Sequence, residues 1–295
     1  MVPVSRAEPL PICHLDGQWL PLRDARISPL DRGFLFGDGV YEVVPVFQGR
    51  PFRFNEHFDR LARSAAAIGL IDPHSRAAWR ELVRELLVRN GGGDQYIYVQ
   101  VTRGAEFGRN HAPPSGLRPT VFAFSAPLPV MSPSKRAQGL ACVTATDIRW
   151  ARCDIKSTAL LANVMRRHEA DEAGADETIL LADGMLREAT ASTVHVVRSG
   201  TVFTPPNAHV ILPGTTRTVV EELAERIGIP CVSRPVTETE LRSADEIWLA
   251  AATRNVAAVT RLDGRPVGSG QPGPLWMQMS QAFDQLQQEL AGTPW

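Results

Sequence analysis

Lysine is nearly absent from this sequence, and one of its two lysines lies where a reactive amine is expected. The 295 residues contain only Lys135 and Lys156, although lysine and arginine together number 31. Arginine carries the same charge, but its guanidinium stays protonated and does not act as a nucleophile. A lysine kept in an arginine-rich chain is therefore a candidate for chemistry of the amine itself. Chance survival under an arginine-rich codon bias is the alternative explanation.

The surroundings of the two lysines differ. Lys135 lies in MSPSKRAQG, a loop-like stretch rich in Pro, Ser and Gly. Lys156 follows the alternating apolar and polar stretch DIRWARCDIK and precedes a helical pattern. A position between regular elements favours partial desolvation, which in turn favours the neutral, nucleophilic form of the amine. We expect Lys156 to be reactive and Lys135 to be incidental.

An amine of this kind forms Schiff bases, and the carbonyl partner is most often pyridoxal phosphate (PLP). PLP also needs a carboxylate at its pyridine nitrogen, and a phosphate site made of backbone N–H groups and a cation. Glu188 in LREATAS is a candidate carboxylate, and PGTTR places Gly214, Thr215 and Thr216 at a helix start. Each motif alone is also typical of a solvated hairpin residue or of an ordinary helix cap.

Composition and charge favour a soluble protein that binds a small molecule. Hydrophobic residues make up 44% and charged residues 21% of the chain, which is typical of globular proteins. The net charge of -1 favours neither nucleic acid nor an anionic membrane as the partner. The start, MVPVSRAEPLPICHL, lacks the long apolar segment of a signal peptide, and no run of about 18 apolar residues follows.

The cysteines indicate a reducing compartment. Cys13, Cys142, Cys153 and Cys231 lie far apart, with no CxxC motif and no Cys/His cluster at metal-ligand spacing. This pattern favours free thiols over a disulfide framework or a zinc site. We therefore expect a cytoplasmic protein without a metal.

The length predicts about two domains. Residues 1–126 have the pattern of a small α+β domain, with hairpins around Asp16 and Gly49 and a helix capped by Asn55. Further elements of this domain are expected at 75–89 (helix), 95–104 (strand) and 118–128 (strand). Prolines in residues 127–138 oppose any regular element, so we expect a linker there.

Residues 139–295 are expected to form the second, larger domain. A strand is expected through 150, and a helix is expected to follow Lys156 and to run to about 173. Asp183-Gly184 predicts a hairpin turn. Further helices are expected within 211–228 and after Pro274.

Six motifs together resemble the fold-type IV PLP aminotransferases, and within that family they most resemble the D-amino-acid branch. The motifs are FGDGVYEVV, NEHFDRL, VTRG with RNH, DIRWARCDIKS, LREATAST and LPGTTR. They occur in the family's order, with similar spacing, from about residue 12 to residue 290. The resemblance implies an α+β fold of two domains with the cofactor at the domain interface, in an enzyme that is usually a homodimer.

The resemblance also implies roles for individual residues. Lys156 becomes the catalytic lysine that bonds to PLP, Glu188 the partner of the pyridine nitrogen, and Arg60 the cation that binds the phosphate. The backbone of Thr215 and Thr216 completes the phosphate site. Further cofactor contacts are implied at Thr190, Ser192, Leu212 and Ala252.

The substrate site follows from the same resemblance. It implies that Tyr41, Arg109 and His111 bind the substrate α-carboxylate and that Val43 lies beside them, while Arg149 acts indirectly. An arginine suits this role because its guanidinium forms a two-pronged pair with a carboxylate.

The chain departs from the family pattern at three places. Ala189-Thr190-Ala191-Ser192 replaces the Gly and serines usual in the D-amino-acid enzymes, which removes one hydroxyl. Leu161 stands where the branched-chain enzymes carry Tyr, which favours the D-specific branch. Arg254 replaces a small residue, and we expect it to reach into the substrate pocket, to pair with an acidic neighbour or to turn to solvent. An inward Arg254 would favour D-glutamate or D-aspartate over D-alanine.

The sequence therefore predicts PLP-dependent transamination between a D-amino acid, of the D-alanine or D-glutamate type, and a 2-oxo acid. Alternatives are a branched-chain L-amino-acid or (R)-amine aminotransferase, a PLP lyase of the aminodeoxychorismate lyase type, and a PLP-binding protein without useful turnover.

Overall fold

The computed structural model describes residues 8–290 and Trp295, and these residues divide into two compact units. The N-terminal unit comprises residues 8–129 with 155–160 and Trp295, and the C-terminal unit comprises 130–154 and 161–290. We propose that the two units are the small and the large domain. The short segment 155–160, which carries Lys156, belongs to the N-terminal unit although both of its flanks belong to the other.

The N-terminal unit is built on a six-stranded antiparallel sheet in the order β2-β1-β6-β5-β3-β4. The turn expected at Asp16 is confirmed, because Leu15 pairs with Gln18 across it. The strands expected at 95–104 and 118–128 also pair, as β5 and β6. The strands are β1 (Ile12–Leu15), β2 (Gln18–Pro21), β3 (Gly39–Phe47), β4 (Arg50–Pro51), β5 (Gln95–Thr102) and β6 (Thr120–Pro127).

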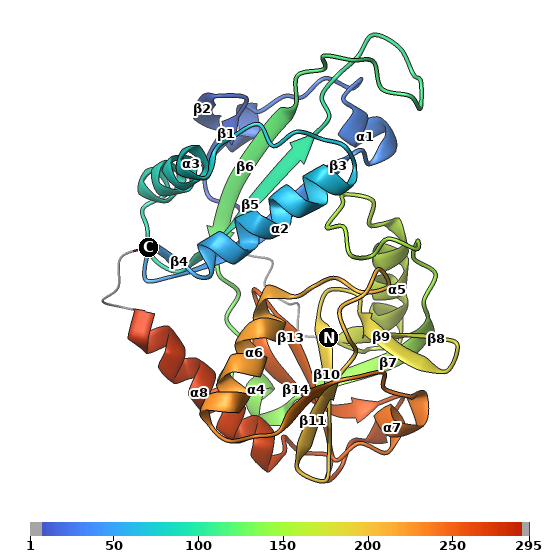
Figure 1. Cartoon of the computed structure of the whole chain (residues 1–295). Coiled ribbons are helices and arrows are strands. Elements are labelled where there is room, and N and C mark those ends of the chain that lie inside the picture. The colour runs from blue at the N-terminus through green and yellow to red at the C-terminus, as the bar shows by residue number, and fades with distance from the viewer. Residues whose placement is uncertain (1–7, 291–294) are drawn as a thin grey trace. The chain divides into compact units, whose positions relative to one another are not determined.

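Helices cover this sheet, as Figure 1 shows, with α2 along β3 and α3 against β1 and β6. The core lies beneath α2 and α3, where apolar side chains of both helices meet the valines of β3 and the apolar residues of β5. The helical elements of the unit are η1 (Leu22–Asp24), α1 (Arg32–Phe36), α2 (Phe54–Ala67) and α3 (Arg76–Arg89).

The start of α2 corrects one expectation. Asn55 does not cap the helix, because α2 begins at Phe54 and its N-cap is Arg53 in a left-handed conformation with φ 54°. The β3–β4 hairpin holds the chain until Phe52, whose N–H donates to the carbonyl of Pro45, and the helix starts directly afterwards.

The C-terminal unit contains a nine-stranded sheet in the order β12-β11-β10-β13-β14-β7-β8-β9, with β15 paired to β14. The pairs β7–β8, β7–β14 and β11–β12 are parallel and the others antiparallel. The strands are β7 (Leu140–Thr146), β8 (Glu177–Ala182), β9 (Met185–Ala189), β10 (Thr193–Arg198), β11 (Thr201–Thr204), β12 (Cys231–Ser233), β13 (Glu246–Ala251), β14 (Asn255–Leu262) and β15 (Arg265–Pro266).

Within residues 130–290, five helices pack around this sheet. In Figure 1, α6 and α8 lie side by side against β13 and β14, and α5 lies against β7 and β8. The expected hairpin at Asp183-Gly184 is confirmed as the β8–β9 turn. The helices are α4 (Pro133–Gln138), α5 (Leu161–Glu172), α6 (Thr215–Arg226), α7 (Glu238–Arg242) and α8 (Pro274–Glu289).

Two expectations for this unit are wrong. The stretch 127–138 contains the helix α4, because Pro133 occupies its first turn, where no N–H is needed, and Ser132 caps it. The strand expected through 150 ends at Thr146. There the Asp147 carboxylate accepts the backbone N–H of Arg149 at 3.0 Å, a local turn that breaks the strand.

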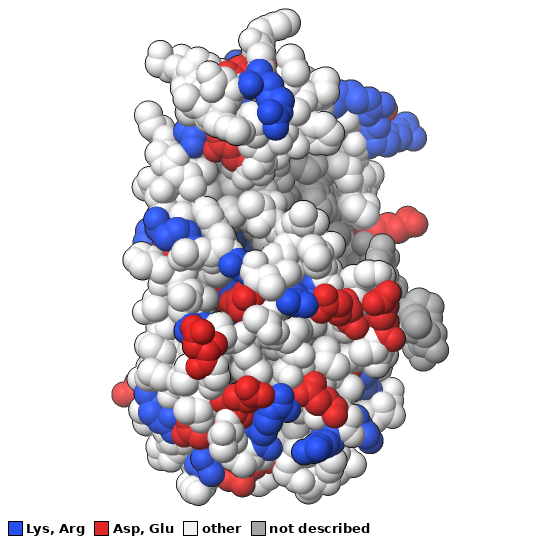
Figure 2. All heavy atoms as spheres, turned by 90° about the vertical axis from the view of Figure 1, so that its right-hand side faces the viewer, with Lys and Arg blue, Asp and Glu red and all other residues white. Residues whose placement is uncertain are grey.

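Charges of both signs are interspersed on the face drawn in Figure 2. No helix among the described residues combines the length and the apolar character needed to span a bilayer. The same residues contain no group of three His, Cys, Asp or Glu side chains that could hold a metal ion.

Candidate functional site

The backbone of Lys156 is fixed from two sides within the N-terminal unit. The N–H of Tyr41, on β3, donates to the Lys156 carbonyl at 3.0 Å. The N–H of Lys156 donates to Oγ of Ser64, on α2, at 3.1 Å. Two residues later, the N–H of Thr158 donates to the carbonyl of Gly39 at 3.0 Å. The segment that carries the predicted catalytic lysine is therefore held against both β3 and α2.

The amine of Lys156 lies over the ring of Tyr41. Nζ is 4.3 Å from the ring centre, a distance at which the electron-rich face of the ring attracts a cation. Tyr41 in turn stacks on Tyr98 of β5, with ring centres 5.5 Å apart. Val43 shares this half-buried face of β3, because side chains two apart on a strand point the same way. Three predicted site residues, Lys156, Tyr41 and Val43, thus lie in or beside one strand.

Arg60 is 5% exposed, so it is not a solvated helix residue. Glu42, on the inner face of β3, holds its guanidinium with both oxygens, at 2.6 Å from Nε and 2.9 Å from Nη2. His57, one turn before Arg60 on α2, places Nδ1 2.8 Å from Glu42 Oε2. A buried polar cluster therefore lies between α2 and β3, near the Lys156 segment.

Electrostatics in this cluster favour an ionised Glu42 and a neutral His57. Burial alone would raise the pKa of the Glu42 carboxyl, but the charge and hydrogen bonds of Arg60 hold that pKa well below its ordinary value. Burial lowers the pKa of His57, and the charges of Arg60 and Lys156 lower it further, against the opposing effect of Glu42. An ionised carboxylate only accepts hydrogen bonds, so Nδ1 of His57 carries the proton between them.

Glu188 stands at the end of β9 in the C-terminal unit and is 6% exposed. Its Oε1 accepts from Nη1 of Arg149 and, at 3.1 Å, from the backbone N–H of Leu212. Arg149 also pairs with Asp147. Although burial by itself lowers the pKa of Arg149, the carboxylates of Asp147 and Glu188 raise it above its ordinary value. Glu188 is therefore a fixed, buried carboxylate rather than a solvated hairpin residue.

The start of α6 has the form of an anion site. Its N-cap is Gly214, which has no side chain to cap the first turn, and Thr215 and Thr216 follow as the first helical residues. A Cβ at Gly214 would lie 2.6 Å from Oγ1 of Thr193, so the Thr193 side chain leaves no room for a larger residue here. Backbone N–H groups at a helix start bind phosphate well.

The predicted contacts Thr190 and Ser192 belong to a network with two residues from elsewhere in the unit. Oγ1 of Thr190 donates to Glu177 Oε1. Nη1 of Arg254 lies 3.3 Å from Glu177 Oε2 and 3.4 Å from Ser192 Oγ. Of its three expected outcomes, Arg254 therefore shows pairing with an acidic neighbour. Ala252 lies in the turn between β13 and β14, next to this network.

The other predicted substrate residues, Arg109 and His111, are exposed and lie on the loop between β5 and β6. Both contact the ring of Phe36: the Arg109 guanidinium is 5.2 Å and the His111 ring 5.6 Å from its centre. Within the part of the chain that the structure describes, no hydrogen bond, ion pair or ring contact joins Tyr41 to either residue. The structure therefore brings Arg109 and His111 together at Phe36, and neither contacts Tyr41 directly.

Sequence reasoning missed Glu42, Glu177 and Arg32. A signal for Glu42 was present, because it shares the period-two pattern of Val40, Val44 and Val46, all fully buried. A carboxylate at such a position needs a buried partner. Glu177 and Arg32 gave no signal of the contacts that matter here. Arg254 lies 77 residues from Glu177, and the carbonyls that Arg32 binds lie 78 and 79 residues from it.

Comparison with known proteins assigns the family. Residues 39–262 match the model of the amino-transferase class IV family. A D-alanine aminotransferase of Bacillus licheniformis is 41% identical over 261 residues, which cover 88% of this chain and 91% of the relative. A D-alanine aminotransferase of Staphylococcus epidermidis is 37% identical over 92% of this chain and 95% of the relative.

Solved structures agree with this assignment. The branched-chain amino acid aminotransferase of Escherichia coli superposes with a TM-score of 0.89 at 25% identity, covering 94% of each chain. A fold IV-transaminase of Curtobacterium pusillum gives 0.78 at 29% identity, also over 94% of each chain. The chain belongs to the class IV aminotransferases, which are PLP-dependent enzymes with the two-domain α+β fold expected from the sequence.

Proposed function

We propose that this enzyme transfers the amino group of a D-amino acid, of the D-alanine or D-glutamate type, to a 2-oxo acid. The observation that carries the proposal is the similarity to D-alanine aminotransferases, at 41% and 37% identity over about nine tenths of the chain. The structural relatives named as branched-chain enzymes are more distant in sequence, at 24 to 26% identity.

The residues present fit PLP. Lys156 would hold the cofactor covalently, the buried carboxylate of Glu188 would face its pyridine nitrogen, and Arg60 with the start of α6 would bind its phosphate. Leu212, whose N–H is tied to Glu188, would pack against the ring. Further contacts are proposed for Thr190, Ser192 and Ala252. When bound, PLP supplies an electron-withdrawing ring that stabilises negative charge at the substrate Cα.

Lys156 is proposed to move the proton at the substrate Cα. Its backbone is fixed by Tyr41 and Ser64, so the side chain that carries the amine has a fixed point of attachment. Positioned proton transfer of this kind typically contributes about 10²- to 10⁴-fold to the rate. Glu42 and Arg60 are proposed to keep their buried pair while Arg60 binds phosphate, so that the cation is oriented before the cofactor arrives.

The substrate carboxylate is proposed to bind Tyr41, Arg109 and His111, with Val43 beside them. Fixing the carboxylate leaves one orientation of the Cα hydrogen toward Lys156, which selects one enantiomer. We call Tyr41, Arg109 and His111 the carboxylate clamp, and Arg109 and His111 are its loop part.

A panel of amino donors tests the proposal. The purified protein should be yellow, and D-alanine or D-glutamate should bleach the colour in the absence of an acceptor, whereas L-leucine should not. Addition of a 2-oxo acid should then restore the colour. Bleaching by L-leucine but by no D-amino acid would instead support the branched-chain alternative. A yellow protein that no donor bleaches would support a binding protein without turnover.

We also propose a homodimer in the cytoplasm. Leu161, Val164 and Met165 form an exposed apolar strip at the start of α5, and such strips commonly mark subunit contacts. Light scattering should give the dimer mass, and a Val164→Glu variant should shift the protein toward the monomer.

The proposed compartment is supported by the cysteines. All four are free thiols in the structure, as suits a reducing compartment.

A further inference from the structure

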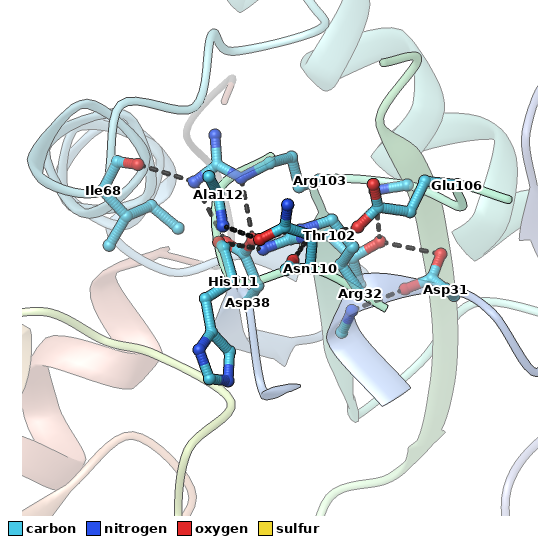
Figure 3. A network of polar contacts seen from close by, with 12 residues as sticks. Asp31, Arg32, Asp38, Ile68, Thr102, Arg103, Glu106, Asn110, His111 and Ala112 are labelled. Carbon is cyan, nitrogen blue, oxygen red and sulfur yellow. Dashed lines mark hydrogen bonds and ion pairs between the residues drawn. The ribbon is translucent and has the colours of Figure 1, made fainter. Parts of the chain in front are cut away.

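The loop that carries Arg109 and His111 is tied to the rest of the N-terminal unit by one buried arginine. Arg32, in α1, is 3% exposed. Its Nη1 donates to the backbone carbonyl of Asn110 at 2.6 Å, and its Nη2 donates to the carbonyl of His111 at 2.9 Å. Nη1 also donates to the Glu106 carboxylate at the start of the loop. Figure 3 shows these groups converging on the Arg32 side chain.

The Arg32 side chain and its helix α1 are also held by residues outside the loop. Its Nε donates to Oδ2 of Asp38 at 2.8 Å, and the same oxygen accepts from Nε of Arg103 at 2.8 Å. Asp31, the N-cap of α1, accepts hydroxyl hydrogen bonds from Thr102 on β5 and Thr120 on β6. The short helix α1 is therefore bound to two strands of the sheet. Because Arg32 belongs to this helix, its hydrogen bonds hold the loop to the sheet.

The ring of Phe36, one turn after Arg32, contacts three side chains. The guanidinium carbons of Arg32 and Arg109 are 4.7 Å and 5.2 Å from its centre, and His111 meets it edge-on. Cations over an aromatic face are attracted to it, and the ring also limits the rotamers of its neighbours. The helix α1 thus contacts the loop backbone through Arg32 and the two predicted substrate side chains through Phe36.

We propose that Arg32 and Phe36 are positioning residues for the loop part of the carboxylate clamp. Arg32 fixes the backbone that carries Arg109 and His111, and Phe36 orients their side chains. The inference rests on the proposed function, because it takes Arg109 and His111 to bind the substrate carboxylate. It adds that the strength of carboxylate binding is set by two residues that need not touch the substrate.

Two variants and a matched control test the proposal. In Arg32→Lys a compact ammonium on a flexible stem replaces the planar fork, so the charge remains but the rigid geometry that holds both carbonyls is lost. Phe36→Leu keeps the loop backbone contacts and removes the ring. The control is Arg103→Lys, since Arg103 shares Asp38 with Arg32 but its other acceptors are the carbonyls of Ile68 and Gly69 rather than the loop.

The first readout is independent of turnover. Within residues 105–119, Arg109 is the only site at which trypsin cuts readily, because Arg118 precedes Pro119. Arg32→Lys should increase the cleavage rate after Arg109 by roughly ten-fold or more, corresponding to the loss of one charged hydrogen bond. Hydrogen exchange of the same loop should rise in parallel. Phe36→Leu and Arg103→Lys should leave loop exchange close to that of the wild type.

The second readout is kinetic and uses the PLP-loaded enzyme. Arg32→Lys and Phe36→Leu should each raise KM for D-alanine by about ten-fold while kcat changes by less than about three-fold. Arg103→Lys should change neither constant. A general folding defect would instead lower kcat and the thermal midpoint in Arg32→Lys and Arg103→Lys alike.

The outcomes separate this inference from the proposed function. Wild-type kinetics and wild-type cleavage in Arg32→Lys would overturn the role of Arg32, and an unchanged KM in Phe36→Leu would overturn that of Phe36. Faster cleavage without any rise in KM would show that the loop is held by Arg32 but does not bind the carboxylate. A wild-type enzyme without activity on any D-amino acid would contradict the proposed function itself.

Discussion

Both oxygens of Glu42 accept hydrogen bonds from the guanidinium of Arg60, at 2.6 Å from Nε to Oε1 and at 2.9 Å from Nη2 to Oε2. Two parallel bonds fix the plane of the guanidinium as well as its position. Glu42 is fully buried, so the pair is not weakened by solvent. The proposed phosphate cation is thus oriented by a strand residue from the opposite side of the α2–β3 interface.

Replacing Glu42 by Gln should therefore damage both folding and cofactor binding. Breaking a buried ion pair typically costs about 3–5 kcal/mol in the free energy of unfolding, and a less oriented Arg60 should weaken PLP binding. Urea unfolding of the PLP-free protein and a spectrophotometric PLP titration measure the two effects. The control is Glu56→Gln, which removes an exposed pair with Arg53 worth at most about 1 kcal/mol. Equal results for the two variants would contradict the role given to Glu42.

Glu188 should act through its charge. In Glu188→Gln the hydrogen bond from Leu212 can persist, whereas the negative charge is lost, so PLP should still bind and the half-reaction with D-alanine should slow. A loss of roughly 10- to 100-fold is expected for one charged hydrogen bond. Stopped-flow measurement of a single turnover checks it. Asp183→Asn, on the exposed turn of the same hairpin, is the control, and a Glu188→Gln rate equal to that of the control would refute the assignment.

Arg254 should affect stability rather than substrate choice. It pairs with Glu177, which is buried, and approaches Ser192. Arg254→Ala leaves that carboxylate without its cation and should lower the free energy of unfolding by about 1–3 kcal/mol. The double variant with Glu177→Gln should recover part of this loss. The ratio of kcat/KM for D-alanine and D-glutamate should stay constant, and a ratio that reverses in Arg254→Ala would place the side chain in the substrate pocket.

His195 should make the protein less stable in mild acid. Its side chain is fully buried, and neither ring nitrogen has a hydrogen-bond partner among the described residues. Burial, helped by the charge of Arg217, lowers its pKa from 6.5 to about 3. Between these values the unfolded state binds one more proton, so stability falls as the pH decreases below 6.5, by about 1.4 kcal/mol per pH unit.

The measurement for His195 is urea unfolding at pH 7 and pH 5. Stability of the wild type should fall by about 2 kcal/mol more than that of a His195→Leu variant over this interval. All other titrating groups are common to the two proteins and cancel in the comparison. The same pH dependence in both proteins would mean that His195 is protonated in the folded state.

Local patterns predicted the helices and strands well where a residue's own chemistry determines the local backbone conformation. The Asp-Gly pairs at 16 and 183 gave the two hairpin turns, and Ser75 caps α3 where the pattern placed its start. The errors arose where the same residue type is compatible with two different backbone conformations. Pro133 opens a helix instead of preventing one, and Asp147 ends a strand that its neighbours would continue.

The site was predictable only in part, for a related reason. Family motifs name the residues proposed to face cofactor and substrate, but they do not name what holds those residues in place. Glu42 supports Arg60, Ser64 supports Lys156, and Arg32 supports the loop of Arg109. These partners come from other elements of the fold, so their pairing depends on tertiary packing and leaves little trace in local spacing.

The most direct test of the role of Lys156 replaces each lysine by arginine. Lys135 forms an ion pair with Asp176 at 2.6 Å, which an arginine can keep, so Lys135→Arg should stay yellow and fully active. Lys156→Arg preserves the charge over Tyr41 but removes the amine, so it should lose both the colour and transamination, with turnover below about a thousandth of the wild type. Turnover of Lys156→Arg above that level, or an equal loss in Lys135→Arg, would contradict the central claim that Lys156 is the catalytic amine.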